Sequence, residues 1–286
     1  YDEQKLKSKN AKKSFVKYLS AEKNQLREQI MKQMRAYNAD STIDNKINEL
    51  LQDEAYYRDK GLVASREKSL SKAKELATTY ERYHLLKEIL LRFTGFVIEF
   101  ERKKLTEPLI RLINEQKKLA SLQETELELK AKNRELFAIY RSGADMSDQI
   151  ISDRAEMLIA EVERHRIRVG NSFTLGVTFE RAFSNYHQLS RNWAAAFDHT
   201  YNEYQLYQKF PHFKQEQKAD YKVCLANLMA RAMSAQKKEA FLAATAEMKS
   251  LPVLSFNEEG EVFQNVFFQE HLFYINQGEF EKAEAL

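Results

Sequence analysis

A glycine in the middle of the segment 50–80 constrains the fold more than any other feature of this chain. Before Gly61, apolar residues recur at intervals of three, four and seven, which is the spacing of one stripe on an α-helix. After Gly61 the same spacing returns, from Leu62 to Ala77. Glycine readily adopts the left-handed backbone conformation that ends a helix. The segment is therefore predicted to form two antiparallel helices joined by a tight turn.

A second glycine near the end of the sequence lies between two similar apolar stripes. It is Gly278, in the segment FFQEHLFYINQGEFEKAEAL at 267–286. A single hairpin of two helices cannot bury both of its apolar faces, so neighbouring hairpins must stack on it. The sequence therefore predicts an all-α fold in which antiparallel helical hairpins stack as an α-solenoid.

The Gly61 hairpin resembles a tetratricopeptide repeat, a helix-turn-helix unit of about 34 residues. When Gly61 is placed on the family's turn glycine, the family's apolar and small positions fall on Leu50, Tyr57, Leu70 and Ala73. The same placement of the C-terminal hairpin matches Phe267, Tyr274, Gly278, Phe280 and Ala283. These two hairpins carry the resemblance, whereas the other segments share only the length and the periodicity of its helices.

Three residues depart from the family's pattern. Glu54 and His271 occupy a position of the first helix where the family has a small residue, and Arg66 replaces an alanine of the second helix. The units are therefore tetratricopeptide-like and divergent. The resemblance implies a superhelix of stacked hairpins whose concave side binds a peptide or protein partner.

Composition agrees with a wholly helical chain. Only 7 glycines and 3 prolines occur in 286 residues, and both residue types are disfavoured inside helices. Charged residues make up 30%, as expected of long amphipathic helices with one solvated face. We interpret residues 1–286 as a single array with a basic helical segment at 1–37. Because the sequence begins without methionine and stops within the first turns of a helix, we expect the chain to continue past residue 286.

Apolar periodicity also predicts the individual helices between the two hinges. A richly apolar helix is expected at 83–104, followed by two separate helices at 109–120 and 124–140. Later helices are expected at 148–166, 173–189, 193–210, 218–233 and 239–248. The turn at 234–238, between the last two of these, contains no glycine, so its register against the repeat is ambiguous.

Charge and cysteine content bear on which partners and which cellular compartment to expect. The net charge of +3 is small for this length and gives no general argument for nucleic acid or a membrane. The only cysteine is Cys224, which excludes an intrachain disulfide and favours a reducing compartment. No run of about 18 apolar residues occurs, so no membrane span is predicted. We expect a cytoplasmic protein.

The sequence contains none of the patterns that catalysis or metal binding requires. No two of the six histidines lie four residues apart on one helix, and a single cysteine excludes zinc fingers. A glycine-rich phosphate loop and a serine nucleophile elbow are both missing. We therefore expect neither an enzyme nor a cofactor.

The basic N-terminal segment is the best candidate for contact with nucleic acid. Its lysines could neutralise phosphates, foremost Lys5, Lys9, Lys12, Lys13 and Lys17. The simpler interpretation is a solvated cap on one end of the array, because no arginine occurs among the first 26 residues and aromatic residues are few there.

The leading functional hypothesis is a protein–protein interaction scaffold that binds a peptide or protein partner in a concave helical groove. On the Gly61 hairpin the predicted groove residues are Asn48, Gln52 and Arg58. The alternative is a sensor array of a transcription regulator whose DNA-binding part lies outside this sequence. The visible residues indicate neither the specific partner nor the oligomeric state.

Overall fold

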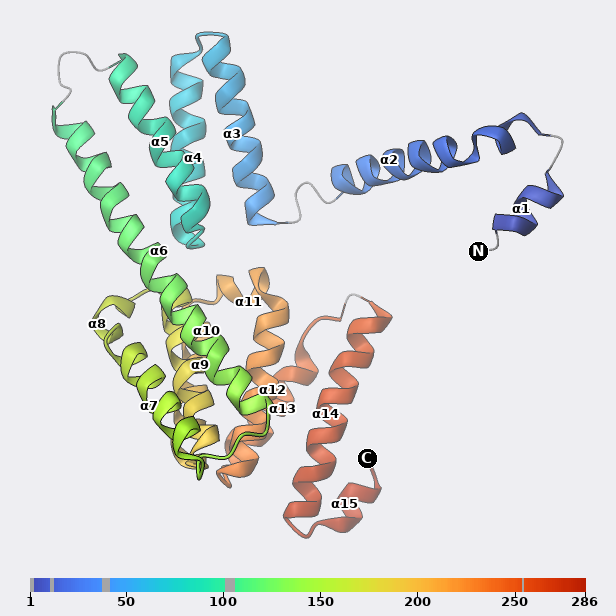
Figure 1. Ribbon diagram of the computed structural model, residues 1–286, viewed down its shortest axis with the longest axis vertical. Coiled ribbons are helices and arrows are strands. Elements are labelled where there is room, and N and C mark those ends of the chain that lie inside the picture. Colours follow the sequence, from blue (N-terminus) through green and yellow to red (C-terminus); the bar gives the residue numbers. More distant parts are fainter. Residues whose placement is uncertain (1–2, 11–12, 38–41, 101–105, 254) are drawn as a thin grey trace. The chain divides into compact units, whose positions relative to one another are not determined.

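The computed structural model describes residues 3–10, 13–37, 42–100, 106–253 and 255–286 (Figure 1). Within these ranges every regular element is a helix and no strand occurs, which confirms the predicted all-α class. The stacking of hairpins into a solenoid stays a prediction. The chain forms two compact units, Tyr1–Ala77 and Thr78–Leu286, and each is described by itself.

The first unit ends in the predicted hairpin. Its helices are α1 (Glu3–Lys9), the 3-10 helix η1 (Ser14–Tyr18), α2 (Leu19–Tyr37), α3 (Ile43–Asp59) and α4 (Val63–Thr79), whose last residues belong to the second unit. Thr42 caps α3, because its hydroxyl accepts a hydrogen bond from the backbone N–H of Asn45 at 3.1 Å. Gly61 has a φ of 69°, and the N–H of Leu62 donates to the carbonyl of Tyr57 at 2.9 Å. The predicted hinge at Gly61 is confirmed.

Glu54 and Arg66 of this hairpin contact each other. Glu54 of α3 and Arg66 of α4 are both buried, and the guanidinium Nε lies 2.8 Å from the carboxylate Oε1. A buried charge is tolerated when an opposite charge is hydrogen-bonded to it. An ion pair therefore fills the space between α3 and α4 at this level of the hairpin.

The second unit contains the remaining helices. They are α5 (Tyr83–Phe100), α6 (Thr106–Arg141), α7 (Gln149–Glu163), α8 (Arg166–Val169), α9 (Phe173–Leu189), α10 (Trp193–Lys209), α11 (His212–Glu216), α12 (Lys218–Ser234), α13 (Lys238–Ser250), α14 (Phe256–Asn276) and α15 (Phe280–Glu284). The predicted separation of helices at 109–120 and 124–140 is wrong, because both lie in the continuous helix α6. No glycine or proline interrupts the helix between them, and Thr125 turns its hydroxyl back to the carbonyl of Ser121 at 2.9 Å.

One turn geometry recurs in three hairpins of this unit. The residue with positive φ is Arg191 between α9 and α10, Gln236 between α12 and α13, and Gly278 between α14 and α15. In each case the next N–H donates to the carbonyl five residues earlier, at 2.9, 2.7 and 2.9 Å respectively. This is the bond made after Gly61 as well. The C-terminal hinge is thus confirmed, and two further hinges use residues that carry a side chain.

Glu81, in the link between α4 and α5, hydrogen-bonds to the N-terminus of α9, about ninety residues later in the sequence. The carboxylate of Glu81 accepts hydrogen bonds from the backbone N–H groups of Phe173 and Thr174, both at 2.8 Å, and from the hydroxyl of Ser172 at 2.9 Å. A carboxylate at a helix N-terminus satisfies free donors and complements the helix dipole. The link between α4 and α5 therefore caps α9.

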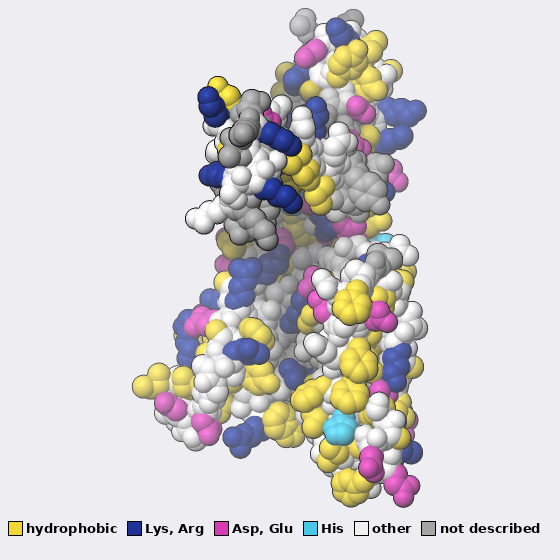
Figure 2. All heavy atoms as spheres, turned by 90° about the vertical axis from the view of Figure 1, so that its right-hand side faces the viewer, with side chains coloured by type: hydrophobic (Ala, Val, Ile, Leu, Met, Phe, Trp, Pro, Cys, Tyr) yellow, Lys and Arg dark blue, Asp and Glu magenta, His cyan; other side chains and the backbone are white. Residues whose placement is uncertain are grey.

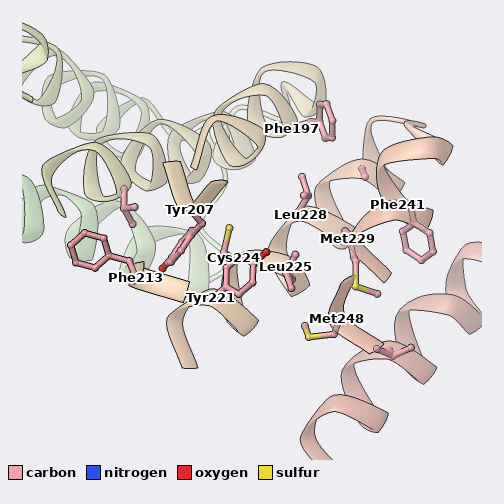
Figure 3. Packing of buried hydrophobic residues seen from close by; sticks show 14 of the residues in the cluster. Phe197, Tyr207, Phe213, Tyr221, Cys224, Leu225, Leu228, Met229, Phe241 and Met248 are labelled. Carbon is pink, nitrogen blue, oxygen red and sulfur yellow. The ribbon is translucent and has the colours of Figure 1, made fainter. Parts of the chain in front are cut away.

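The main core of this unit lies among α9 to α14. It includes Phe173, Tyr207, Tyr221, Leu225, Met229, Phe241 and Phe273, all almost fully buried. Figure 3 shows Leu225, Leu228 and Met229 of α12 lying between the rings of Tyr207 and Phe241. The ring of Phe241 stacks on Phe273 of α14, with centroids 4.1 Å apart. This stack positions α14 beside α12 and α13.

Candidate functional site

A pocket of about 440 Å³ opens where α12 and α14 run beside each other. Residues of both helices line it, together with Met248 of α13. The α12 residues include Lys222, Val223, Ala226 and Asn227, and the α14 residues include Glu258, Glu261, Val262 and Asn265. We call this the α12–α14 pocket. Its size lies in the range of sites that hold small ligands or a few peptide side chains.

The lining combines apolar side chains with a polar rim, by which we mean Lys222, Asn227, Glu258, Glu261 and Asn265. Val223, Ala226 and Val262 supply the apolar surface. Asn227 lies between them in sequence, and its side chain makes no hydrogen bond among the residues that the structure describes. The amide of Asn265 donates to the carbonyl of Glu261 at 2.8 Å, which leaves its own oxygen as an acceptor. Two side-chain amides can therefore bond to a peptide backbone there.

The charges at the rim are unequal. Lys222 lies 3.6 Å from Glu258, so these two largely balance each other. Glu261 has no such partner among the described residues and adds a negative charge to the same rim. An occupant with an apolar side chain and a neighbouring basic residue would match this lining.

The predicted groove residues on α3 lie elsewhere. Asn48, Gln52 and Arg58 are all exposed. The hollow found between α3 and α4 is lined by other residues, among them Leu50 and Leu76, and Asn48 and Gln52 project from the opposite side of α3. The structure therefore gathers none of the three around that hollow. Arg58 has an exposed neighbour in Asp59, with the two charged groups 3.7 Å apart.

The predicted basic patch is only partly described. Lys9, Lys13 and Lys17 are exposed. The side chain of Lys5 and the whole of Lys12 lie outside the described residues. The exposed lysines agree with both interpretations of this segment, because a solvated cap and a phosphate-binding surface would each expose them.

Sequence reasoning missed the α12–α14 pocket for an identifiable reason. The turn after α12 is centred on Gln236 rather than glycine, so the α12–α13 hairpin was not aligned with the repeat. The available signal was the polar residue Asn227 within the apolar run of α12. That signal is weak alone, because helix faces often carry an exposed amide.

A polar network beside the pocket ties four helices together. Glu247 of α13 accepts hydrogen bonds from the hydroxyls of Tyr221 and Tyr204, the latter at 2.7 Å, and from Lys214 Nζ at 3.1 Å. Burial alone would raise the pKa of Glu247, but these donors outweigh burial and lower it. Burial, followed by the hydrogen bond to Glu247, raises the pKa of Tyr204. The network is fully bonded and thus acts as a structural junction of α10 to α13.

Two histidines form the other notable polar cluster. His199 Nδ1 lies 2.7 Å from Glu180 Oε2, and its ring stacks on His187 with centroids 5.3 Å apart. Burial, and then the neighbouring His199, lowers the pKa of His187, which favours the neutral ring at pH 7. Within the described ranges no three His, Cys, Asp or Glu side chains gather as the ligands of a metal ion would.

Comparison with protein families, with characterised proteins and with solved structures finds no match to this chain. Any functional conclusion must therefore rest on the geometry of the chain itself. In the part of the chain that the structure describes, no helix has the length and apolar character needed to cross a membrane.

Proposed function

We propose that this protein is a protein–protein interaction scaffold that binds a short peptide segment of a partner in the α12–α14 pocket. The observation that carries the proposal is the lining of the pocket, which combines apolar side chains with two side-chain amides that have free bonding capacity. Peptides are recognised by this combination, because amides bond to the extended backbone and apolar pockets select side chains.

The rim indicates the chemistry of the peptide. Its apolar residue would rest on Val223 and Val262, and its backbone would bond to Asn227 and Asn265. A Lys or Arg beside that residue would approach Glu261, the carboxylate that Lys222 does not balance. Only a few peptide residues fit in the pocket, so we expect modest affinity that a partner could raise by binding a second surface.

Selection from a random peptide display library tests this proposal with the full chain. We expect enriched peptides that pair a medium-sized apolar residue with Lys or Arg. Hydrogen exchange with a selected peptide should show added protection in α12 and α14. Protection confined to other helices would refute the assignment of the site.

A pair of matched variants separates the pocket from the general surface. Val223→Ser removes an exposed apolar side chain from the pocket, whereas Leu242→Ser removes one from α13 outside it. We expect Val223→Ser to weaken peptide binding by about tenfold and Leu242→Ser to leave it unchanged, as a buried contact is worth about 1–2 kcal/mol in binding. Equal binding by both variants would overturn the proposal.

The proposal assigns the chain no catalytic role and no cofactor. The single cysteine, Cys224, is buried and free, which supports a reducing compartment, and we propose the cytoplasm as the site of action. The DNA-binding regulator remains an alternative prediction, because no described residue bears on it.

A further inference from the structure

One side of α14 carries a row of aromatic rings that stack on each other, and the last of them, His271, also hydrogen-bonds through Nδ1 to the carbonyl of Ala283 in α15 at 3.1 Å. Phe263 stacks on Phe267 with centroids 5.3 Å apart, and Phe267 stacks on His271 at 5.8 Å. Phe256 lies on the same side at the start of the helix and is strongly exposed. Figure 2 shows hydrophobic side chains and a histidine gathered where α14 and α15 lie. We call Phe256, Phe263, Phe267 and His271 the α14 aromatic face.

This face is distinct from both other sides of the helix. The buried side, with Val266 and Phe273, packs into the core, where Phe273 stacks on Phe241. The pocket side, with Glu261 and Asn265, lies about half a turn away from the aromatic face at about 100° per residue. The three phenylalanines of the aromatic face therefore lie away from the core and from the proposed peptide site, whereas His271 also joins α14 to α15.

The surroundings of the aromatic face are acidic. Residues 256–286 contain seven glutamates against a single lysine, a net charge of −6 for this segment, and lysines of other helices pair with three of the glutamates, Glu258, Glu270 and Glu279. Glu259 is exposed and lies one helical turn before Phe263, beside the aromatic row. A partner for this face would thus combine apolar side chains with positive charge.

The chain itself contains a helix of that kind. Every side chain of α2 from Ser20 to Met34 is exposed, and Leu26, Ile30 and Met34 recur every four residues as one apolar stripe. The helix itself carries four Lys and Arg against two Glu, and residues 1–37 as a whole carry ten Lys and Arg against four Asp and Glu. Most of the stability of an amphipathic helix comes from packing of its apolar face, so α2 needs a surface to cover that stripe.

We propose that α2 of one copy of this protein packs on the α14 aromatic face of a second copy. The two helices match in length, at about 28 and 32 Å for 19 and 21 residues. Arg27, which flanks the stripe of α2, would approach Glu259 beside the aromatic row. Because the two surfaces differ, the contact is head-to-tail and builds chains or closed rings of copies.

Sedimentation velocity of the full chain over a wide concentration range tests for this contact. We expect oligomers that form as the concentration rises. Phe263→Ser should raise the apparent dissociation constant at least about tenfold, as loss of a central aromatic contact does. Phe268→Ser is the matched control, because Phe268 is equally exposed, 62% against 61%, but projects from another side of α14.

The same comparison applies to the other helix. Ile30→Ser should weaken association more than Met31→Ser does, since Met31 is similarly exposed, 43% against 48%, but lies about 100° around the helix from Ile30, at the edge of the contact. None of these side chains is buried, so the variants should keep their fold, and circular dichroism checks this. A chain that stays monomeric at every concentration would overturn the proposal.

A mixing experiment shows whether the contact is head-to-tail. A copy with Phe263→Ser keeps a functional α2, and a copy with Ile30→Ser keeps a functional aromatic face. Each should associate alone at least about tenfold more weakly than the unchanged chain, and their mixture should form one-to-one dimers with the affinity of the unchanged contact. If Ile30→Ser abolished association while Phe263→Ser left it intact, α2 would pair with α2 and the proposal would be wrong.

A charge exchange tests the register. Arg27→Glu and Glu259→Lys should each weaken association, and the chain carrying both changes should recover it. Lys32→Glu makes the same charge change as Arg27→Glu on the far side of α2 and should have little effect. Failure of the doubly changed chain to recover would remove the Arg27–Glu259 contact and with it the proposed docking of the two helices.

Discussion

The α3–α4 and α12–α13 hairpins share one turn but join their helices by opposite chemistry. In α3–α4 the residue seven positions before the turn residue Gly61 is Glu54, and the residue five positions after it is Arg66. These two form an ion pair. At the corresponding positions α12–α13 has Met229 and Phe241, both fully buried in the apolar core. The backbone geometry of the turn therefore does not dictate what fills the space between the helices.

The difference determines which substitutions between its two helices each hairpin can tolerate. An apolar pair that is trimmed slightly loses contact area and leaves a small cavity, and the cost grows with the volume of that cavity. An ion pair that loses one partner leaves a charge in a site without water, which costs about 3–5 kcal/mol whatever the size of the replacement. Replacement of both charges by apolar side chains can be neutral, because the desolvation cost vanishes with them.

Loss of one charge in α3–α4 should have the largest effect. We expect Arg66→Met to destabilise the hairpin by about 3–5 kcal/mol, because the carboxylate of Glu54 is then buried without its cation. The double variant Glu54→Met/Arg66→Phe, which copies the α12–α13 pair, should recover to within about 1 kcal/mol of the unchanged chain. Native-state hydrogen exchange of α3 and α4 measures both. Equal damage in the single and double variants would show that the two hairpins are not interchangeable.

The apolar hairpin should respond less to a partial change. Phe241→Leu keeps an apolar side chain but loses the stack on Phe273, so we expect a cost of about 1–2 kcal/mol. Leu242→Ala, at a half-exposed neighbour, should cost well under that amount. Hydrogen exchange of the α13 amides as a function of urea concentration gives the change in unfolding free energy for both variants. A loss of stability in Phe241→Leu as large as that in Arg66→Met would contradict the comparison.

The turns themselves should respond with opposite signs. Gly61 and Gln236 both have positive φ, at 69° and 56°, but only glycine adopts this conformation freely. Gly61→Gln should destabilise α3–α4 by about 1 kcal/mol, and Gln236→Gly should stabilise α12–α13 by a similar or smaller amount. No heavy atom lies within 4 Å of a Cβ built on Gly61, so the cost there is purely one of backbone conformation. Thermal unfolding of the two variants tests the signs.

The smallest effect concerns Glu247, which accepts hydrogen bonds from Tyr204, Tyr221 and Lys214 at the edge of α12–α13. The pKa of Glu247 is lowered, so its bonds stabilise the fold above its ordinary pKa of 4.5 and are lost as the pH falls through the lower, folded value. Glu247→Gln should therefore unfold more easily than the unchanged chain at pH 7, and the gap should close in acid. Unfolding curves measured from pH 7 to pH 3 test this, and a constant gap would assign the stabilisation to packing.

Much of the helical framework was predictable because its determinants are local. The apolar stripes around Gly61 and Gly278 depend only on the spacing of nearby residues, and both hinges occur where expected. The hinges at Arg191 and Gln236 were not predictable as left-handed turns, because tertiary packing holds side-chain-bearing residues in a conformation that they disfavour alone. The continuous helix α6 was missed because local periodicity alone suggested a break where none exists.

The candidate site was less accessible to sequence reasoning. The sequence indicated Asn48, Gln52 and Arg58 from the clearest hairpin, but the best pocket brings together α12 and α14, which are separated by α13. A pocket depends on which helices become neighbours, and that choice is made by contacts such as the stack of Phe241 on Phe273. No local pattern records such a pair.

The sequence by itself determined that this chain is helical and where two of its hinges lie, because helix periodicity and the freedom of glycine act over a few residues. Only the tertiary structure decided that Glu54 meets Arg66, that Glu81 caps α9 and that α14 borders α12. Those outcomes depend on desolvation and close packing between distant segments, which are properties of the assembled core.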